Sequence, residues 1–299
     1  MLRIVRRIIS VFAISALSAA LAPAARAAPE VVVSIAPVHS LVAAVMGKVA
    51  TPKLLVPPGA SPHAFSLRPS DARALANADI VFRVGADLEI FLDKPLAALV
   101  SGIVVTLADA PGITEQPITP NSGDAEEHTN DPHIWLSIAN ARLIGEVAAQ
   151  TLGNHDPENA GAYGQNLAAL NERLNGLERD LRDQLRSTRK SPYVVLHDAY
   201  RHFEAEFGLQ RAAAISLSPE RRPGARRLRE IRGLLAAEDV RCVFAEPQFP
   251  NAIAASVTEG TNARLAELDP IGAGLAVGPE LYFDLMYNLG RSMTGCLGG

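Results

Sequence analysis

Three of the seven histidines lie in loops that come just after predicted β-strands. His63 follows the apolar run 53–56, and His197 closes the run 193–196. His133 follows a polar loop. Ligands of open α/β sheets bind at the carboxyl ends of the strands, because side chains from several strands converge there. His63, His133 and His197 are therefore candidate ligands of one shared site.

A carboxylate is predicted to complete this set, since Asp269 follows the last predicted strand. Three imidazole nitrogens and one carboxylate oxygen form a closed four-coordinate set. Such a set suits Zn²⁺ better than Ca²⁺ or Mg²⁺, which prefer oxygen ligands. A filled fourth position leaves no bound water to attack a substrate, so binding without catalysis is expected. A single histidine beside a proline is more often a turn or surface residue, and that alternative stays open for each one taken alone.

The remaining histidines of the predicted elements are interpreted as structural. His39 is placed near the start of the first helix, and His155 near a helix boundary. His202 lies five residues beyond His197 on a predicted helix, which turns the two side chains about 140° apart. These two histidines therefore do not readily face one ion.

The elements that would position the site alternate along the chain. Predicted strands cover residues 31–35, 53–56, 79–84, 102–107, 193–196, 211–216, 241–245 and 264–267. Predicted helices cover residues 41–46, 70–78, 89–99, 137–152, 200–207, 225–237, 253–260 and 279–296. This alternation is typical of an α/β fold with mainly parallel sheets.

One long helix is predicted between the two series of strands. Its apolar residues recur every three or four positions: Tyr163, Leu167, Leu170, Leu174, Leu177, Leu181 and Leu185. The pattern predicts one helix over about 156–187, roughly 45 Å long at 1.5 Å per residue. A coiled coil would fit the spacing too, but the run is short and lies between two α/β segments. We expect a single connector between two lobes.

These patterns predict two α/β lobes with mainly parallel sheets joined by one long rigid helix. The expected division is a signal peptide over 1–27, an N-terminal lobe over 28–152, the linking helix over 153–190 and a C-terminal lobe over 191–299. Within the first lobe, prolines, a glycine and acidic residues over 109–130 predict a mobile acidic loop.

The N-terminus has the composition of a secretory signal. Three arginines among the first seven residues precede an uncharged run, and Ala25-Arg26-Ala27 matches a small-residue cleavage site. We expect a mature chain that starts near Ala28. The alternative is an uncleaved membrane anchor, because the uncharged run is almost long enough to span a bilayer.

Charge and cysteine content narrow the partners and the compartment. Loss of the signal would change the formal net charge from -4 to -8, since four arginines and no acidic residue leave. An acidic body argues against nucleic acid as a partner. In an oxidising compartment, the two cysteines, Cys242 and Cys296, predict a disulfide. Two buried free thiols are the alternative.

Several motifs resemble, in the same order, those of the zinc-specific periplasmic substrate-binding proteins of bacterial ABC importers, in the metal-binding solute-binding family (cluster A-I). They are GASPH at 59–63, SLRPSD at 66–71, DPHIW at 131–135, HDAY at 197–200, FAEPQF at 244–249 and LDP at 268–270, with a cysteine near the C-terminus. The similarity covers essentially the whole mature chain.

The resemblance implies two lobes joined by one rigid helix, with the metal in the cleft between them. It implies His63, His133 and His197 as ligands, and Asp269 as the fourth ligand or as a group close enough to exchange with water. In manganese-binding relatives the position of His197 is typically a carboxylate. The imidazole here favours zinc, because nitrogen-rich sets disfavour manganese.

The resemblance also implies a function and partners. We expect a monomer that captures Zn²⁺ in the periplasm and delivers it, without catalysis, to a membrane permease driven by a cytoplasmic ATPase. Glu246 is expected to contact a ligand histidine and fix its tautomer. Trp135 is expected to pack beside the site.

Two departures limit what the resemblance transfers. Some zinc-binding members have an acidic residue directly before the first histidine, where this chain has Pro62, so no ligand comes from that position. Many members also have a long His- and Asp-rich loop before the second histidine. Here the loop offers mainly His128 and a few acidic residues, and a secondary zinc-collecting role competes with that of a simple solvated loop.

Two other functions remain as alternatives. One is a manganese or iron carrier of the same fold. The other is a zinc hydrolase, because three histidines and an activated water can also form a catalytic site. Against the hydrolase, the sequence has no His-Glu-x-x-His pattern and Asp269 is expected to fill the open position.

Overall fold

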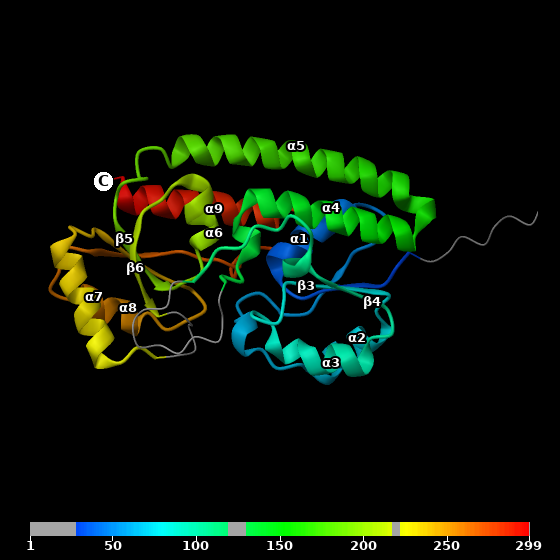
Figure 1. Ribbon diagram of the computed structural model, residues 1–299, viewed down its shortest axis with the longest axis horizontal. Helices are drawn as coiled ribbons and strands as arrows, with labels where there is room; N and C mark the ends of the chain where they lie inside the picture. Colours follow the sequence, from blue (N-terminus) through cyan, green and yellow to red (C-terminus); the bar gives the residue numbers. More distant parts are fainter. Residues whose placement is uncertain (1–27, 119–129, 217–221, 299) are drawn as a thin grey trace, which may run out of the picture.

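Two parallel four-stranded β-sheets form the frame of the protein (Figure 1). The computed structural model describes residues 28–118, 130–216 and 222–298. The first sheet has the order β2-β1-β3-β4, with β1 at Val31–Val33, β2 at Lys53–Leu54, β3 at Ile80–Arg83 and β4 at Ile103–Thr106. The second has the order β6-β5-β7-β8, with β5 at Tyr193–His197, β6 at Arg211–Ser216, β7 at Cys242–Ala245 and β8 at Arg264–Glu267. Neighbouring strands in both sheets are parallel, which confirms the predicted α/β fold class.

The predicted signal peptide, the loop residues 119–129 and His128 lie outside the described residues. Among the residues that are described, no helix has the length and apolar character needed to cross a bilayer.

The inner strands are the most apolar parts of each sheet. β1 consists of three buried valines, and all five residues of β5 are buried. The edge strands β4 and β8 are largely exposed. Strands that are covered on both faces need a continuous apolar run, whereas edge strands do not, and the sequence follows this rule.

Helices pack around the sheets and between them. They are α1 (Ala36–Met46), α2 (Pro69–Asn77), α3 (Asp93–Leu99), α4 (Ile138–His155), α5 (Ala160–Gln184), α6 (Arg201–Phe207), α7 (Ala225–Ala237), α8 (Ala252–Thr258) and α9 (Leu281–Leu297). Figure 1 shows α5 along the top of the molecule, with α9 and α4 beneath it.

Prolines account for two differences from the predicted helices. The segment 89–99 forms a 3-10 turn, η2 (Ile90–Leu92), followed by α3, because Pro95 has no N–H and fits only in the first turn of a helix. The long helix is 25 residues, shorter than the predicted span. It begins later because Pro157 starts a separate 3-10 turn, η5 (Pro157–Asn159), and it ends at Gln184.

The linking helix buries five of the seven residues of the predicted stripe, while Leu167 is partly exposed and Leu185 follows the end of the helix. Tyr163, Leu170, Leu174, Leu177 and Leu181 are buried in α5, which contacts α1, α4 and α9. The same hydrophobic cluster contains core residues of both sheets and of α9. The two halves of the chain therefore share one core. The exact lobe boundaries at 152 and 190 remain a prediction.

A disulfide joins Cys242, at the start of β7, to Cys296, in the last turn of α9. This disulfide was predicted from the two cysteines, on the expectation that the chain enters an oxidising compartment. It fastens the C-terminal helix, which also packs on α1 and α5, to the second sheet.

Glu89 is a fully buried acid in the first half of the chain. One of its carboxylate oxygens accepts a hydrogen bond from the Gly85 amide at 3.1 Å. Burial raises the pKa of Glu89 from 4.5 to about 7, since the charged form loses its water. The folded protein therefore holds this proton more tightly than the unfolded chain does.

We expect Glu89→Gln to change the pH dependence of stability. A raised carboxyl pKa means that the parent loses stability as pH rises from about 4.5 to about 7, by up to about 3 kcal/mol. Glutamine does not titrate, so the free energy of unfolding of the variant should rise relative to that of the parent as pH increases across this interval. Urea unfolding at several pH values measures this difference. Glu172→Gln, at an exposed position of α5, is the matched control. A Glu89→Gln difference that is constant with pH would contradict the assignment.

Candidate metal centre

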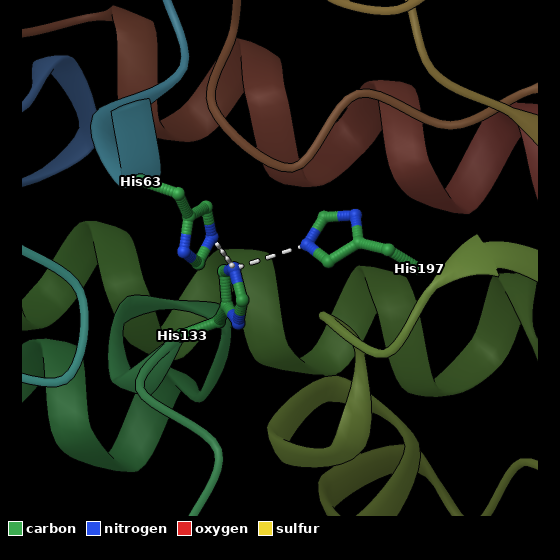
Figure 2. Close-up of side chains that lie close together, drawn as sticks. All are labelled: His63, His133 and His197. Carbon is green, nitrogen blue, oxygen red and sulfur yellow. Dashed lines mark hydrogen bonds between the residues drawn. The ribbon is translucent and has the colours of Figure 1, made fainter. Parts of the chain in front are cut away.

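The three predicted histidines reach one point from three separate loops or strand ends. His63 lies in the 3-10 turn η1 (Pro62–Ala64), and the Ser61 hydroxyl accepts a hydrogen bond from the His63 amide at 3.3 Å. His133 directly precedes the 3-10 turn η4 (Ile134–Leu136), and His197 is the last residue of β5. Figure 2 shows the three rings turned toward one another.

The distances between the rings fit a tetrahedral ion. The Nε2 atom of His133 lies 3.4 Å from Nε2 of His63 and 3.3 Å from Nε2 of His197. One ligand atom from each ring lies within 4.8 Å of the other two. In a tetrahedron with Zn–N bonds of about 2.0–2.1 Å, the distance between ligand atoms is about 3.3–3.4 Å. Two of the three ring pairs therefore have the spacing of tetrahedral zinc ligands, and the ligand atoms of the third pair lie within 4.8 Å of each other.

Two buried carboxylates set the tautomers of the rings. Nδ1 of His133 donates to Asp131 at 2.6 Å, and Nδ1 of His197 donates to Glu246 at 2.6 Å. A carboxylate can only accept, so each Nδ1 carries a proton and each Nε2 of a neutral ring presents its lone pair. Two acceptors that face each other at 3.3 Å repel unless a cation lies between them. This arrangement of lone pairs therefore favours a bound cation.

Charge around the site reinforces this preference. Burial lowers the pKa of His197, but the adjacent Glu246 carboxylate outweighs it, and the pKa lies above the ordinary 6.5. Burial raises the pKa of Asp131, but the charge and hydrogen bond of His133 outweigh it and hold the pKa at about 2. Asp131 is therefore ionised, and the site favours positive charge.

The space between the rings is small. The three histidines border a cavity of about 20 Å³, which is also lined by apolar groups of Trp135, Phe249 and other residues. One water molecule needs about 10–15 Å³ by a comparable measure. The cavity accommodates an ion and has no room for an organic substrate.

The sequence matches the family model described as "Zinc-uptake complex component A periplasmic" over residues 31–296. The chain belongs to this zinc-uptake family. The high-affinity zinc uptake system protein ZnuA of Brucella abortus (strain 2308) is 38% identical over 305 residues, covering 89% of this chain and 91% of the relative.

Solved structures share the fold of this zinc-uptake family member. A crystal structure of ZnuA superposes with a TM-score of 0.78 and 24% identity, covering 91% of this chain and 99% of that one. A Pseudomonas aeruginosa binding protein in complex with Mn²⁺ superposes with a TM-score of 0.81 and 24% identity, covering 91% of this chain and 99% of that one. The fold alone therefore does not choose the metal, and the choice depends on the donor atoms. The family is periplasmic and consists of non-catalytic transport components, so the chain is a binding protein and not an enzyme.

Asp269 is not part of the histidine group in the described structure. One of its oxygens accepts hydrogen bonds from Gln248 Nε2 at 2.7 Å and from the amides of Ile271 and Gly272. The other accepts from the Ala273 amide at 2.6 Å. To bind an ion directly, this carboxylate would have to give up some of these bonds. Its role as the fourth ligand stays a prediction.

Asp131 is the site residue that sequence reasoning missed. It belongs to the DPHIW motif and lies two residues before His133, but no role was assigned to it. Its second oxygen accepts from the Arg201 amide at 3.1 Å, at the start of α6. An aspartate two residues from a candidate ligand was the available signal, but only the fold places it beside Nδ1 of the ring.

Two further histidines bond to backbone carbonyls, in keeping with the structural role expected of them. His39 Nε2 lies 2.9 Å from the Pro52 carbonyl, and His202 Nε2 lies 2.9 Å from the Asp131 carbonyl. Trp135 packs beside the site, with its ring centroid 5.2 Å from that of His133. Its indole N–H donates to the Pro270 carbonyl at 2.8 Å, which links the two halves of the chain.

Zinc binding should change the fluorescence of Trp135, because the ring of a metal ligand lies against the indole. The chain has one tryptophan, so the signal has a single source. We expect a saturable change at one equivalent of Zn²⁺ that a chelator reverses, in a fluorescence titration of the metal-free protein. Trp135→Phe should still bind zinc by calorimetry but give no such signal. An unchanged emission in a protein that binds zinc would contradict the packing.

Proposed function

We propose that this protein captures Zn²⁺ in the periplasm and delivers it to the membrane permease of an ABC importer. The observation that carries the proposal is the convergence of three imidazoles on one point, with the His133 nitrogen at the ligand spacing of tetrahedral zinc from the other two. The donor set supports zinc over manganese, since manganese prefers oxygen ligands and binds nitrogen more weakly. Family membership implies the permease and its cytoplasmic ATPase as partners. We expect the protein to be a monomer.

The finer assignments belong to the same proposal. His63, His133 and His197 bind the ion, and Asp269 is the fourth ligand or lies close enough to exchange with a water ligand. A signal peptide over 1–27 is removed on export, and the two lobes are linked by the region 153–190. Because the two halves share one core, lobe movement on binding is expected to be small.

Metal titration by calorimetry tests the site. The mature protein should bind one Zn²⁺ tightly, and His63→Ala, His133→Ala and His197→Ala should each weaken binding by about 100-fold or more, because each removes one bond to the ion. Asp269→Ala should cost less, since its carboxylate is held by four hydrogen bonds.

The matched control for this titration is His155→Ala, a partly exposed histidine away from the site, which should bind like the parent. If the three histidine variants bind like the parent, the site is wrong. If Mn²⁺ displaces Zn²⁺ at equal concentration, the protein is a manganese carrier.

Zinc affinity should fall as the medium is acidified. Only neutral imidazole binds a metal, so protons compete with zinc below the pKa of each ligand. For His197 this competition begins above pH 6.5, because Glu246 raises its pKa. Competition with a zinc-binding dye at pH 8, 7, 6 and 5 should show a steepening loss of affinity. A flat profile would mean that histidines do not bind the ion.

A further inference from the structure

Gln248 is a polar residue next to the three histidines, and the proposed site gives it no role so far. It lies in the segment between β7 and α8 and borders the same small cavity as the three rings. Two neighbours in this segment also serve the site. Glu246 orients His197, and the Phe249 ring lies 6.4 Å from the His197 ring.

The orientation of the Gln248 amide follows from its partner. Nε2 of Gln248 donates to Oδ1 of Asp269 at 2.7 Å. Both oxygens of Asp269 accept hydrogen bonds from backbone amides, so the Gln248 nitrogen must face the carboxylate and the Gln248 oxygen must face away. Within the described structure, Oε1 of Gln248 is buried and has no hydrogen-bond partner.

A buried acceptor without a partner is costly. Leaving such a group unsatisfied costs about 1–3 kcal/mol, and the great majority of buried polar atoms in proteins are satisfied. A cation in the adjoining cavity would satisfy this oxygen. Zinc in proteins is almost always four-coordinate, so an ion bound by the three imidazoles would take one more donor.

We propose that Oε1 of Gln248 supplies the fourth donor to the bound zinc, and that Asp269 is a positioning residue that holds the Gln248 amide. The inference rests on the proposed function, because it concerns the same ion. It gives Asp269 a role that keeps its four hydrogen bonds intact.

A neutral fourth ligand suits a carrier. A carboxylate would add a full negative charge next to Zn²⁺ and strengthen its retention, whereas an amide oxygen offers only a dipole. An ion held by three histidines and an amide is bound selectively but released more easily. This difference matters at the permease, where the ion has to leave.

A double-mutant cycle tests the inference. Gln248→Leu removes the amide at nearly constant volume, and Asp269→Ala removes the group that holds it. We expect Gln248→Leu to weaken zinc binding about 10–100-fold, a range typical for groups that tune a metal site. If Asp269 acts through Gln248, Asp269→Ala should weaken binding in the parent but have little further effect in the Gln248→Leu variant.

Cobalt supplies a readout that a structural role would not move. The visible absorption of Co²⁺ depends on its ligands and geometry, so Gln248→Leu should alter the spectrum of the Co²⁺-loaded protein. Gln165→Leu, at an exposed position of α5, is the matched control and should leave spectrum and affinity unchanged. Thermal unfolding of the metal-free variants checks that each still folds. If Gln248→Leu does not fold, Gln248→Asn takes its place in the Co²⁺ experiment. The shorter side chain of asparagine withdraws the oxygen from the ion, so the spectrum should again change.

Additive losses in the cycle, or an unchanged Co²⁺ spectrum in the Gln248 variant, would overturn this inference and leave the zinc carrier standing. Failure of the parent to bind Zn²⁺ through the three histidines would overturn the proposed function itself.

Discussion

The site depends on one electrostatic constraint. The Nε2 atoms of two histidine rings, each with a lone pair, are held facing each other. His133 and His197 each give their Nδ1 proton to a buried carboxylate, so their Nε2 atoms meet at 3.3 Å as two acceptors. Such a pair is unstable by itself and is satisfied by a cation. Asp131 and Glu246 make the arrangement possible, because they fix which nitrogen faces inward and place negative charge behind each ring.

Holding such a pair together requires a rigid frame. His133 and His197 come from different halves of the chain, and several contacts prevent the halves from separating. The Trp135 indole bonds to Pro270, the Tyr282 hydroxyl bonds to the Trp135 carbonyl, and Asp131 accepts from the start of α6. The shared hydrophobic core under α5 and α9 adds to these contacts. A frame of this kind favours capture and release of an ion with little domain movement.

Fold and metal choice are separate properties of this architecture. The Mn²⁺-bound structure with a TM-score of 0.81 has the same frame. What differs between carriers is the chemistry of the few side chains at the point where the lobes meet. Here those side chains are nitrogen-rich, and their spacing matches a small tetrahedral ion. The small volume between the rings, about 20 Å³, further limits the site to an ion.

Much of this protein could be predicted from the sequence because its determinants are local. The alternation of β-branched runs with helical periodicity predicted both sheets, and the leucine stripe predicted α5, since each pattern acts over one element. His63 and His197 could be named as candidate ligands because each follows or ends a parallel strand, where ligands of α/β sheets bind, whereas His133 directly follows no described strand of either sheet. The disulfide between Cys242 and Cys296 could be predicted because these are the two cysteines of a chain that is expected to carry an export signal.

Contacts between distant segments could not be predicted in this way. Sequence spacing does not show that Asp131 turns one oxygen to His133 and the other to Arg201, or that Asp269 is held by Gln248 and three backbone amides. Those partners are chosen by how the two halves pack on each other, and only the tertiary structure decides them.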